Sequence, residues 1–225
     1  MPIVVFGCGG RMIVDIEESC ARLGIEIAAI VKNFDGPAHA LAPERIVDAD
    51  DIDEAIRACR YVIPFFSPGH RFAAHRDAVT RGFRRAATII DPTAVVARSA
   101  TADRGTYVNA GAVIGGAARL GAFVFINRSA NIGHDVEMDD FASVAPGATI
   151  CGGVRLGLGA VVAAGAIVCP EVRVGANSVI AAGAVVREPV ADHCLVVGNP
   201  ARIVDSQYAG FRSMSIPESA RLDRS

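Results

Sequence analysis

The stretch that decides the fold is IGGAARLGAFVFINRSANIGHDV, residues 114–136, in which a large aliphatic residue recurs at every sixth position. The register continues in both directions without an insertion, so that seventeen positions from Ile90 to Val186 are all apolar. A second series, four residues after each of these, is small or β-branched, as at Ala130 and Val136. A period of six fits neither an α-helix, with 3.6 residues per turn, nor a continuous strand, with a side-chain period of 2.

The repeat therefore predicts a solenoid of short strands separated by corners. The large aliphatic residue of each hexad points inward and stacks on its counterpart in the next coil, and the small residue fits where the wall is narrow. Glycine and aspartate at intervening positions, such as Gly115, Gly133, Asp139 and Gly157, suit corners that need unusual backbone dihedrals. An ordinary sheet with a coincidental run of β-branched residues would not keep this register over seventeen hexads.

The first 88 residues have a different pattern, in which short apolar segments alternate with segments of helical spacing. We expect strands at 3–6, 26–31 and 61–66, and helices at 13–23, 50–59 and 71–81. Such alternation predicts a small parallel sheet. The chain thus divides into a first domain over 1–88, a β-helix over 89–204 and a polar, non-periodic tail over 205–225. We expect the tail to be loosely held.

A glycine-rich turn, GCGG at residues 7–10, lies between the first expected strand and the first expected helix. Its backbone N–H groups and the helix N-terminus can hold a phosphate. The spacing is not a complete dinucleotide fingerprint, because the third glycine of GxGxxG would fall at Met12 and no acidic residue ends the second strand. A structural turn and a phosphate site are both compatible with this feature.

Composition excludes several classes of protein. A net charge of −2 gives no basic surface for nucleic acid or for an anionic membrane. The apolar runs are shorter than the ~20 residues of a membrane helix, and the N-terminus lacks a secretory signal pattern. Six scattered cysteines without a CxxC pair predict reduced thiols, and we expect a cytoplasmic protein.

The order of these features resembles a known family. A GxGG domain, a hexapeptide β-helix and a terminal VGNPA at residues 197–201 are similar to the sialic acid O-acetyltransferase and bacillosamine N-acetyltransferase family, which includes nucleotide-amino-sugar acetyltransferases. The likeness extends to about Val204. It implies an α/β Rossmann-like acceptor-binding domain over 1–88, followed by a left-handed parallel β-helix with three hexads per coil. It also implies a homotrimer with active sites between subunits, acetyl-CoA as cosubstrate, no metal, and a sugar acceptor that is nucleotide-linked.

In that family a histidine followed by an acidic residue provides the catalytic base, and the match here is His134 with Asp135. His134 follows Ile132 by two residues, at a corner, so we expect its ring to face outward. A neutral imidazole can take a proton from an attacking amine or hydroxyl, and Asp135 would orient the ring. Taken alone, a corner histidine is more often a polar surface residue. The His-Asp pair in this family context favours the catalytic interpretation.

The resemblance assigns further contacts position by position. Ser143, Ala164 and Ala182 match residues that contact acetyl-CoA, the last two through backbone groups, although β-helix packing alone also explains small residues there. The expected acceptor-binding residues are Gly9, Gly10, Arg11, Lys32, Asn33 and Asn127.

The acceptor half departs from the family pattern. Arg11 stands where a histidine is frequent, and Lys32 and Asn33 replace paired aspartates that are associated with recognition of the nucleotide base. The segment FSP at 66–68 replaces a GDN or GNN segment. Arg11 and Lys32 favour an anionic group. Since the acceptor half departs from the family pattern, the identity of the acceptor stays open, and so does the choice between N- and O-acylation.

Two other functions are compatible with a β-helix. One is a non-catalytic scaffold or ligand-binding trimer, which the altered acceptor loops favour. The other is a metal enzyme like the γ-carbonic anhydrases, which needs three histidine ligands. The repeat region contains His134 alone, and His193 lies beyond it.

Overall fold

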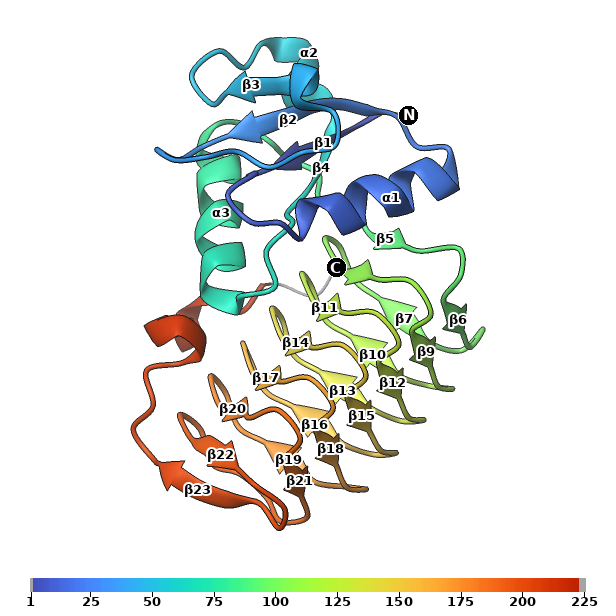
Figure 1. Cartoon of the computed structure of the whole chain (residues 1–225), viewed down its shortest axis with the longest axis vertical. Coiled ribbons are helices and arrows are strands. Elements are labelled where there is room, and N and C mark those ends of the chain that lie inside the picture. Colours follow the sequence, from blue (N-terminus) through green and yellow to red (C-terminus); the bar gives the residue numbers. More distant parts are fainter. Residues whose placement is uncertain (1, 223–225) are drawn as a thin grey trace.

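A computed structural model describes residues 2–222 of the chain, so Met1 and the last three residues of the expected tail, 223–225, lie outside the described residues. Figure 1 shows a stack of β-coils with a smaller sheet and its helices at one end, above the first coils. The repeat accounts for the stack, and the first 88 residues account for the unit above it.

The repeat forms a parallel β-helix of two-residue strands, and each strand from β5 to β21 ends on a residue of the six-step series. Strands stack in three parallel sheets with partners eighteen residues apart, as in the pairing of Phe125 with Ser143, so one coil holds three hexads. The first sheet contains β5 (Ile89–Ile90), β8 (Tyr107–Val108), β11 (Phe125–Ile126), β14 (Ser143–Val144), β17 (Val161–Val162), β20 (Val179–Ile180), β22 (Leu195–Val197) and the antiparallel β23 (Arg202–Asp205). The second contains β6 (Val95–Val96), β9 (Val113–Ile114), β12 (Asn131–Ile132), β15 (Thr149–Ile150), β18 (Ile167–Val168) and β21 (Val185–Val186). The third contains β7 (Thr101–Ala102), β10 (Arg119–Leu120), β13 (Glu137–Met138), β16 (Arg155–Leu156) and β19 (Arg173–Val174).

The six-step series fills the interior of the coils, as the sequence predicts. From Val108 to Val186 every member is at most 3% exposed, and the small residues of the second series lie among them. Burying each aliphatic side chain stabilises the fold by roughly 1.5–3 kcal/mol. The first coil is the exception, since Val96 is 37% exposed because no coil lies above it.

The corner glycines are needed for a reason that differs from the prediction. Gly115, Gly133 and Gly157 do not have a positive φ; a Cβ at Gly133 would lie 2.6 Å from the Gly152 nitrogen of the next coil. Close approach of successive coils therefore excludes a side chain there. The left-handed backbone falls two residues later in the hexad, as at Asp135 (φ 56°), and recurs every six residues from 105 to 183.

The first 88 residues form a four-stranded parallel sheet with the order β3-β2-β1-β4. The strands are β1 (Ile3–Phe6), β2 (Ile27–Lys32), β3 (Ile46–Asp48) and β4 (Arg60–Val62), and the helices are α1 (Ile13–Leu23), α2 (Glu54–Ala58), α3 (Pro68–Thr80) and the 3-10 turn η1 (Pro43–Arg45). The expected strands and helices are found. The short β3 was not predicted, β4 stops at residue 62 rather than 66, and α3 begins earlier, because Pro68 takes the first helical position.

A fully buried arginine of α3 joins this unit to the first coils. Arg71 is 1% exposed and donates from Nε to the Phe123 carbonyl (2.7 Å) and from Nη2 to the Phe141 carbonyl (2.6 Å). Its Nη1 donates to the carbonyls of Phe65 and Phe66 (2.6 and 2.8 Å). Burial lowers the pKa of Arg71 to about 9, so the group stays charged at neutral pH. One guanidinium thus connects α3, the loop before it and two coils.

A second polar cluster joins α1 to the first coil. The carboxylate of Asp91 is buried and accepts from the Ser19 hydroxyl (2.6 Å), from Arg22 Nη2 (2.7 Å) and from the Thr93 hydroxyl (2.6 Å). Burial alone would raise the pKa of Asp91, but these hydrogen bonds outweigh it and hold the pKa well below its usual range. The α1 helix is therefore fixed on top of the coils, with its N-terminus directed to one side of them (Figure 1).

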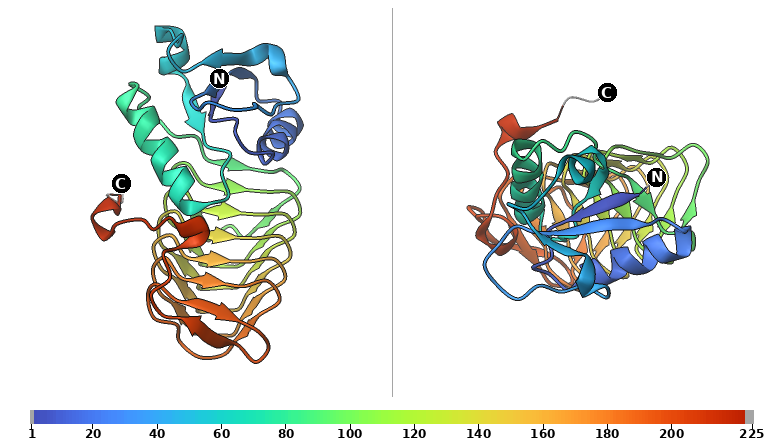
Figure 2. Two further views of the ribbon diagram at one scale, coloured as in Figure 1. Left: turned by 60° about the vertical axis from the view of Figure 1, so that its left-hand side comes forward. Right: turned by 90° about the horizontal axis from the view of Figure 1, so that it is seen from above.

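The segment after β23 is held against the coils, unlike the loosely held tail that the sequence led us to expect. Ile216 is 1% exposed, and its N–H and carbonyl are bonded to the side chain of Asn177 (2.8 and 3.0 Å). The segment forms the short turns η2 (Phe211–Ser213) and η3 (Glu218–Ala220) and returns along the coils to the start of α3 (Figure 2). The buried side chain of Ile216 and the buried amide of Asn177 thus help to hold a segment whose composition is polar.

Within residues 2–222, none of the helices has the length and apolar character needed to cross a bilayer. All six cysteines are free thiols.

Candidate active site

A cavity of about 950 Å³ opens where α1, α3 and one corner of the β-helix meet. Its walls come from the turn before α1, the loop before α3, one face of α3 and the C-terminal segment. The lining residues are Gly9, Gly10, Arg11, Met12, Val14, Asp15, Asn33, Phe34, Pro64, Phe65, Phe66, Ser67, His70, Ala73, Ala74, Asp77, Arg128, Phe211 and Arg212. The N-termini of α1 and α3 both border the cavity, which gives it a positive electrostatic character.

Four of the six residues expected to bind an acceptor line this cavity: Gly9, Gly10, Arg11 and Asn33. Lys32 does not, and it lies partly buried near Cys8, where its charge opposes the effect of burial on the pKa of the thiol. Asn127 is 4% exposed and accepts a hydrogen bond from the Asn109 amide (3.1 Å). Its neighbour Arg128 reaches the cavity instead.

Two carboxylates of the cavity already have partners. Asp15, at the start of α1, accepts from Arg128 Nη1 (2.9 Å) and from the Asn109 amide (3.1 Å). Asp77, on α3, accepts from the Asn33 amide (2.9 Å) and from Arg81 Nε (2.9 Å). These pairs fix Asn33 and Arg128 in the wall.

The predicted catalytic pair lies on the outside of a corner. His134 Nδ1 is 2.8 Å from Asp135 Oδ2, and the two side chains are 75% and 66% exposed. The imidazole ring lies over Gly152 of the next coil, because a Cβ at Gly152 would be 2.6 Å from His134 Nε2. With the carboxylate accepting from Nδ1–H, a neutral ring presents the lone pair of Nε2 to the exterior.

His134 does not line the cavity of its own chain. Arg128 follows β11 of the first sheet, whereas His134 follows β12 of the second sheet, so the two occupy different corners of the same coil. The cavity and His134 therefore flank the outer face of the second sheet rather than sharing one concave site within one chain.

The three residues expected to contact acetyl-CoA have different environments. Ser143 is 0% exposed, and its hydroxyl donates to the Phe66 carbonyl (2.8 Å) and accepts from Arg71 Nη2 (2.9 Å). Its side chain has a structural role and offers no surface to a ligand. Ala164 and Ala182 are exposed, and they lie one and two coils below Pro146, on the corner that carries Arg128 at the cavity.

Below the cavity this corner carries only small side chains and glycines that face open space. A Cβ added at Gly147, Gly165 or Gly183 would meet nothing within 4 Å. Backbone N–H groups connect successive coils there, from Gly165 to the Pro146 carbonyl (3.1 Å) and from Gly183 to the Ala164 carbonyl (3.0 Å). The structure thus has a smooth column that leads from Arg128 down the β-helix.

Several cavity residues were not singled out from the sequence. Ser67 and His70 come from the first turn of α3, where Ser67 Oγ is 2.9 Å from His70 Nδ1. Phe211 and Arg212 come from the C-terminal segment, whose sequence carries no repeat or motif. Among these residues the sequence indicated only Ser67, as part of the FSP segment that departs from the family pattern.

Within residues 2–222 there is no group of three or more His, Cys, Asp or Glu side chains placed to hold a metal ion.

No family model matches the chain, and no curated protein matches it. Solved structures do. Perosamine N-acetyltransferase (PerB) from Caulobacter crescentus, in complex with CoA and GDP-perosamine, is 29% identical over 91% of this chain and 98% of that chain, with a TM-score of 0.80. The acetyltransferase domain of PglB from Neisseria gonorrhoeae, in complex with acetyl-CoA, is 26% identical over 90% of this chain and 98% of that chain, with a TM-score of 0.79.

WeeI from Acinetobacter baumannii has the same fold, with 19% identity over 91% of this chain and all of that chain, and a TM-score of 0.77. The neighbours above 25% identity are thus a perosamine N-acetyltransferase and an acetyltransferase domain, and the resemblance to hexapeptide-repeat acyltransferases that the sequence predicted is confirmed. Two neighbouring structures are of perosamine N-acetyltransferase variants in which one histidine is replaced by asparagine or alanine.

Proposed function

We propose that the chain is an acetyl-CoA-dependent acetyltransferase that acts on an amine or hydroxyl of a nucleotide-linked sugar, with His134 as general base. The observation that carries the proposal is the pair of His134 and Asp135 at 2.8 Å, which leaves Nε2 of an exposed imidazole free to accept a proton. The amine in GDP-perosamine, the ligand of a neighbour, supports the amine as the acceptor group.

The reaction follows from this geometry. The acceptor amine attacks the thioester carbonyl carbon of acetyl-CoA while its proton passes to Nε2 of His134. The C–S bond then breaks, and the CoA thiolate takes up the proton, which returns His134 to its neutral form. Asp135 holds the ring in the tautomer that keeps Nε2 unprotonated. General-base help of this kind accelerates a reaction by roughly 10²–10⁴.

The corner with small side chains is the proposed path of the donor. A pantetheine arm is narrow and can lie along a column that includes Ala164 and Ala182, since their small side chains leave backbone groups accessible. The column begins beside Arg128, so a donor placed there has one end at the acceptor cavity. Ser143 is not part of this path.

A second copy of the chain is part of the proposed site. The outer face of the second sheet carries Val95, Val113 and Ile167, which are 65%, 41% and 38% exposed. Asn131 and Thr149 lie between them in the same row, and the exposed apolar side chains favour burial against another copy. A trimer packed on this face would bring His134 of one copy to the cavity of the next. The same proposal includes a left-handed β-helix and a Rossmann-like domain over 1–88 that binds the acceptor.

The test of the reaction is a thiol-release assay with acetyl-CoA and a panel of acceptors. The panel contains nucleotide-linked amino sugars, free amino sugars and amino acids, and mass spectrometry of the product locates the acetyl group. We expect CoA release that depends on a nucleotide-linked sugar. No release with any acceptor, together with no binding of acetyl-CoA in calorimetry, would identify the chain as a non-catalytic trimer instead.

The shared site has a separate test by complementation. One variant, His134→Ala, lacks the base, and another, Ala73→Trp, fills the cavity from an exposed position of α3. Each alone should be inactive. After subunit exchange, verified with differently tagged copies, the mixture should regain activity. A mixture that exchanges but stays inactive would place the whole site within one copy.

A further inference from the structure

We propose that the turn of residues 210–213 in the C-terminal segment is a wall of the acceptor cavity, and that Arg212 binds the phosphate groups of a nucleoside diphosphate. The inference deepens the proposed function, because it takes the cavity to be the acceptor site. It assigns recognition of the acceptor to a segment that follows the β-helix, and it names the residue responsible.

The turn is held in place from both sides. Before it, the Tyr208 N–H donates to the His193 carbonyl (2.7 Å). After it, Ile216 is buried and is bonded twice to the Asn177 side chain (2.8 and 3.0 Å). Between these anchors Phe211 and Arg212 lie in the cavity wall. The position of the turn is therefore fixed by the coils and does not depend on a bound ligand.

The turn also contacts the start of α3. A Cβ at Gly69 would lie 2.5 Å from Cβ of Met214, so only glycine allows the segment to approach the first turn of the helix this closely. Arg212 itself has a left-handed backbone, with a φ of 59°. A non-glycine residue keeps this conformation where the surrounding structure imposes it, as at the corners of the coils.

Two cations of the cavity are available for an anion. In the part of the chain that the structure describes, Arg11 and Arg212 have no carboxylate partner, whereas Arg128 is paired with Asp15. Burial of His70 is the main cause that lowers the pKa of His70, and the charge of Arg212 lowers it further. Arg212 therefore lies close to the N-terminus of α3, and both residues line the cavity. The N–H groups of a helix N-terminus favour phosphate, and two guanidinium groups beside them add charge-assisted hydrogen bonds.

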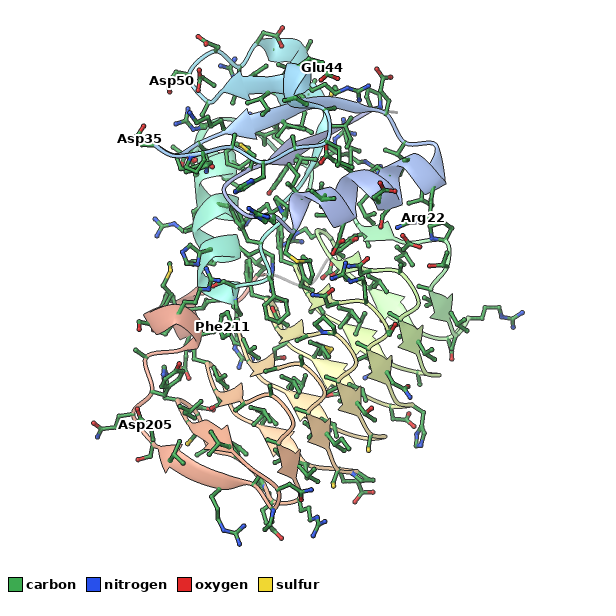
Figure 3. The ribbon with its side chains drawn as sticks, viewed as in Figure 1. Arg22, Asp35, Glu44, Asp50, Asp205 and Phe211 are labelled. Carbon is green, nitrogen blue, oxygen red and sulfur yellow. The ribbon has the colours of Figure 1, made fainter. Side chains whose placement is uncertain are left out.

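Aromatic side chains beside these cations fit the flat part of a nucleotide. The ring of Phe211 packs edge-on against Phe66 with centroids 5.8 Å apart, and Phe34 and Phe65 line the same cavity. Figure 3 labels Phe211 near the lower end of α3. A cavity of about 950 Å³ with aromatic walls and unpaired arginines accommodates a base and a diphosphate together. An inorganic anion would use only the arginines.

The experiment is calorimetric titration of the full chain with GDP, UDP and inorganic pyrophosphate, without acetyl-CoA. The main variant is Arg212→Asn, because asparagine tolerates a left-handed backbone and carries no charge. Arg212→Lys keeps the charge. The matched control is Arg221→Ala in the same segment, because Arg221 pairs with Asp139 (3.3 Å) outside the cavity.

We expect a nucleoside diphosphate to bind more tightly than pyrophosphate and the affinity to fall at least about tenfold in Arg212→Asn, the loss of one charge-assisted bond. The lysine variant should recover part of it, and the Arg221→Ala control should stay within about twofold of the wild type. Equal affinity in Arg212→Asn and wild type, or no binding of any diphosphate by the wild type, would overturn the proposal. Tighter binding of pyrophosphate would show an anion site without base recognition and would also overturn it.

His134→Ala separates this inference from the proposed reaction. His134 does not line the cavity of its own chain, and diphosphate binding needs no proton transfer. If His134→Ala keeps full catalytic activity while Arg212→Asn loses diphosphate binding, the proposed mechanism fails and the acceptor site stands. If His134→Ala is inactive and Arg212→Asn binds as the wild type does, the reverse holds.

Discussion

His134 Nδ1 and Asp135 Oδ2 lie 2.8 Å apart on the outer surface of a corner, although the two residues are neighbours in the sequence. The side chains of consecutive residues in an extended strand point to opposite faces. Here the backbone of Asp135 is left-handed, with a φ of 56°, and the chain turns between the second and third sheets. The corner thus converts a dipeptide into an oriented imidazole, and the first two predictions concern this geometry.

Replacing Asp135 with asparagine should lower kcat while the fold stays intact. Asparagine tolerates the left-handed backbone of this position, so the corner is preserved, but an amide can also donate to Nδ1 and stabilise the wrong tautomer. We expect kcat to fall at least about tenfold with a KM near that of the wild type. Steady-state kinetics and a thermal unfolding curve measure the two effects separately. An unchanged kcat would remove Asp135 from the mechanism.

Replacing Gly152 with alanine should displace the imidazole ring of His134. The new Cβ would lie 2.6 Å from His134 Nε2, so the imidazole must rotate away. The matched control is Gly116→Ala on the same corner two coils before Gly152, where the nearest atom is Ser99 Oγ at 3.4 Å. Neither glycine has a positive φ. We expect Gly152→Ala to lose activity and Gly116→Ala to keep it, with similar melting temperatures; equal activity in both would argue against a role for the ring position.

Replacing Arg71 with methionine should destabilise the junction between α3 and the coils. The substitution leaves the carbonyls of Phe123, Phe141 and Phe65 without their donor from Arg71. Each unsatisfied buried group costs about 1–3 kcal/mol, so we expect a loss of at least about 3 kcal/mol in denaturant unfolding. The control is Arg76→Met, an exposed arginine of the same helix that lies over the Phe72 ring. Similar stabilities of the two variants would contradict the role assigned to Arg71.

His75 should make the fold sensitive to mild acid. Its Nδ1 is 2.7 Å from the Tyr61 hydroxyl, its ring packs on Phe123, and burial lowers the pKa of His75 from 6.5 to about 4. The unfolded chain therefore binds the proton more tightly than the folded chain does. The contribution of neutral His75 to the free energy of unfolding is fully present above pH 6.5. It is lost as the pH falls from 6.5 to about 4, and the total loss is about 3 kcal/mol.

The measurement is the free energy of unfolding between pH 7.5 and 4 for the wild type and for His75→Phe. Phenylalanine keeps the ring but does not titrate, so the variant should lose the part of the pH dependence that belongs to His75. The lost bond to Tyr61 adds an offset that does not vary with pH in this range. Parallel curves for the two proteins would show that His75 does not titrate with a lowered pKa.

The sequence predicted the β-helix well because the hexad pattern is local and repeated. It did not predict why Gly133 is a glycine. A positive φ and a close approach of two backbones both require glycine, so the sequence alone does not distinguish them. The structure separates them: the Cβ of any other residue would collide with the next coil, and the left-handed residue is Asp135. The short β3 (Ile46–Asp48) was missed because three residues carry too little pattern.

The residues that the sequence indicated for the candidate site lie in short motifs or, like Asn33, came from the family resemblance. His134 and Asp135 form a dipeptide, and Gly9 and Gly10 lie within one turn, so both features were visible. Arg71 resembled any polar helix residue, because its partners on the β-helix lie 52 to 72 positions away. The place of Arg212 in the cavity depends on the bonds between Asn177 and Ile216, which no local pattern encodes.

The central claim is that His134 is the general base, and the most direct measurement is kcat of His134→Ala in the acetyl-CoA thiol-release assay. We predict a loss of roughly 10²–10⁴ in kcat, with acetyl-CoA binding and the melting temperature unchanged, because the ring is 75% exposed and supports no core packing. A kcat equal to that of the wild type in a folded variant would contradict the account.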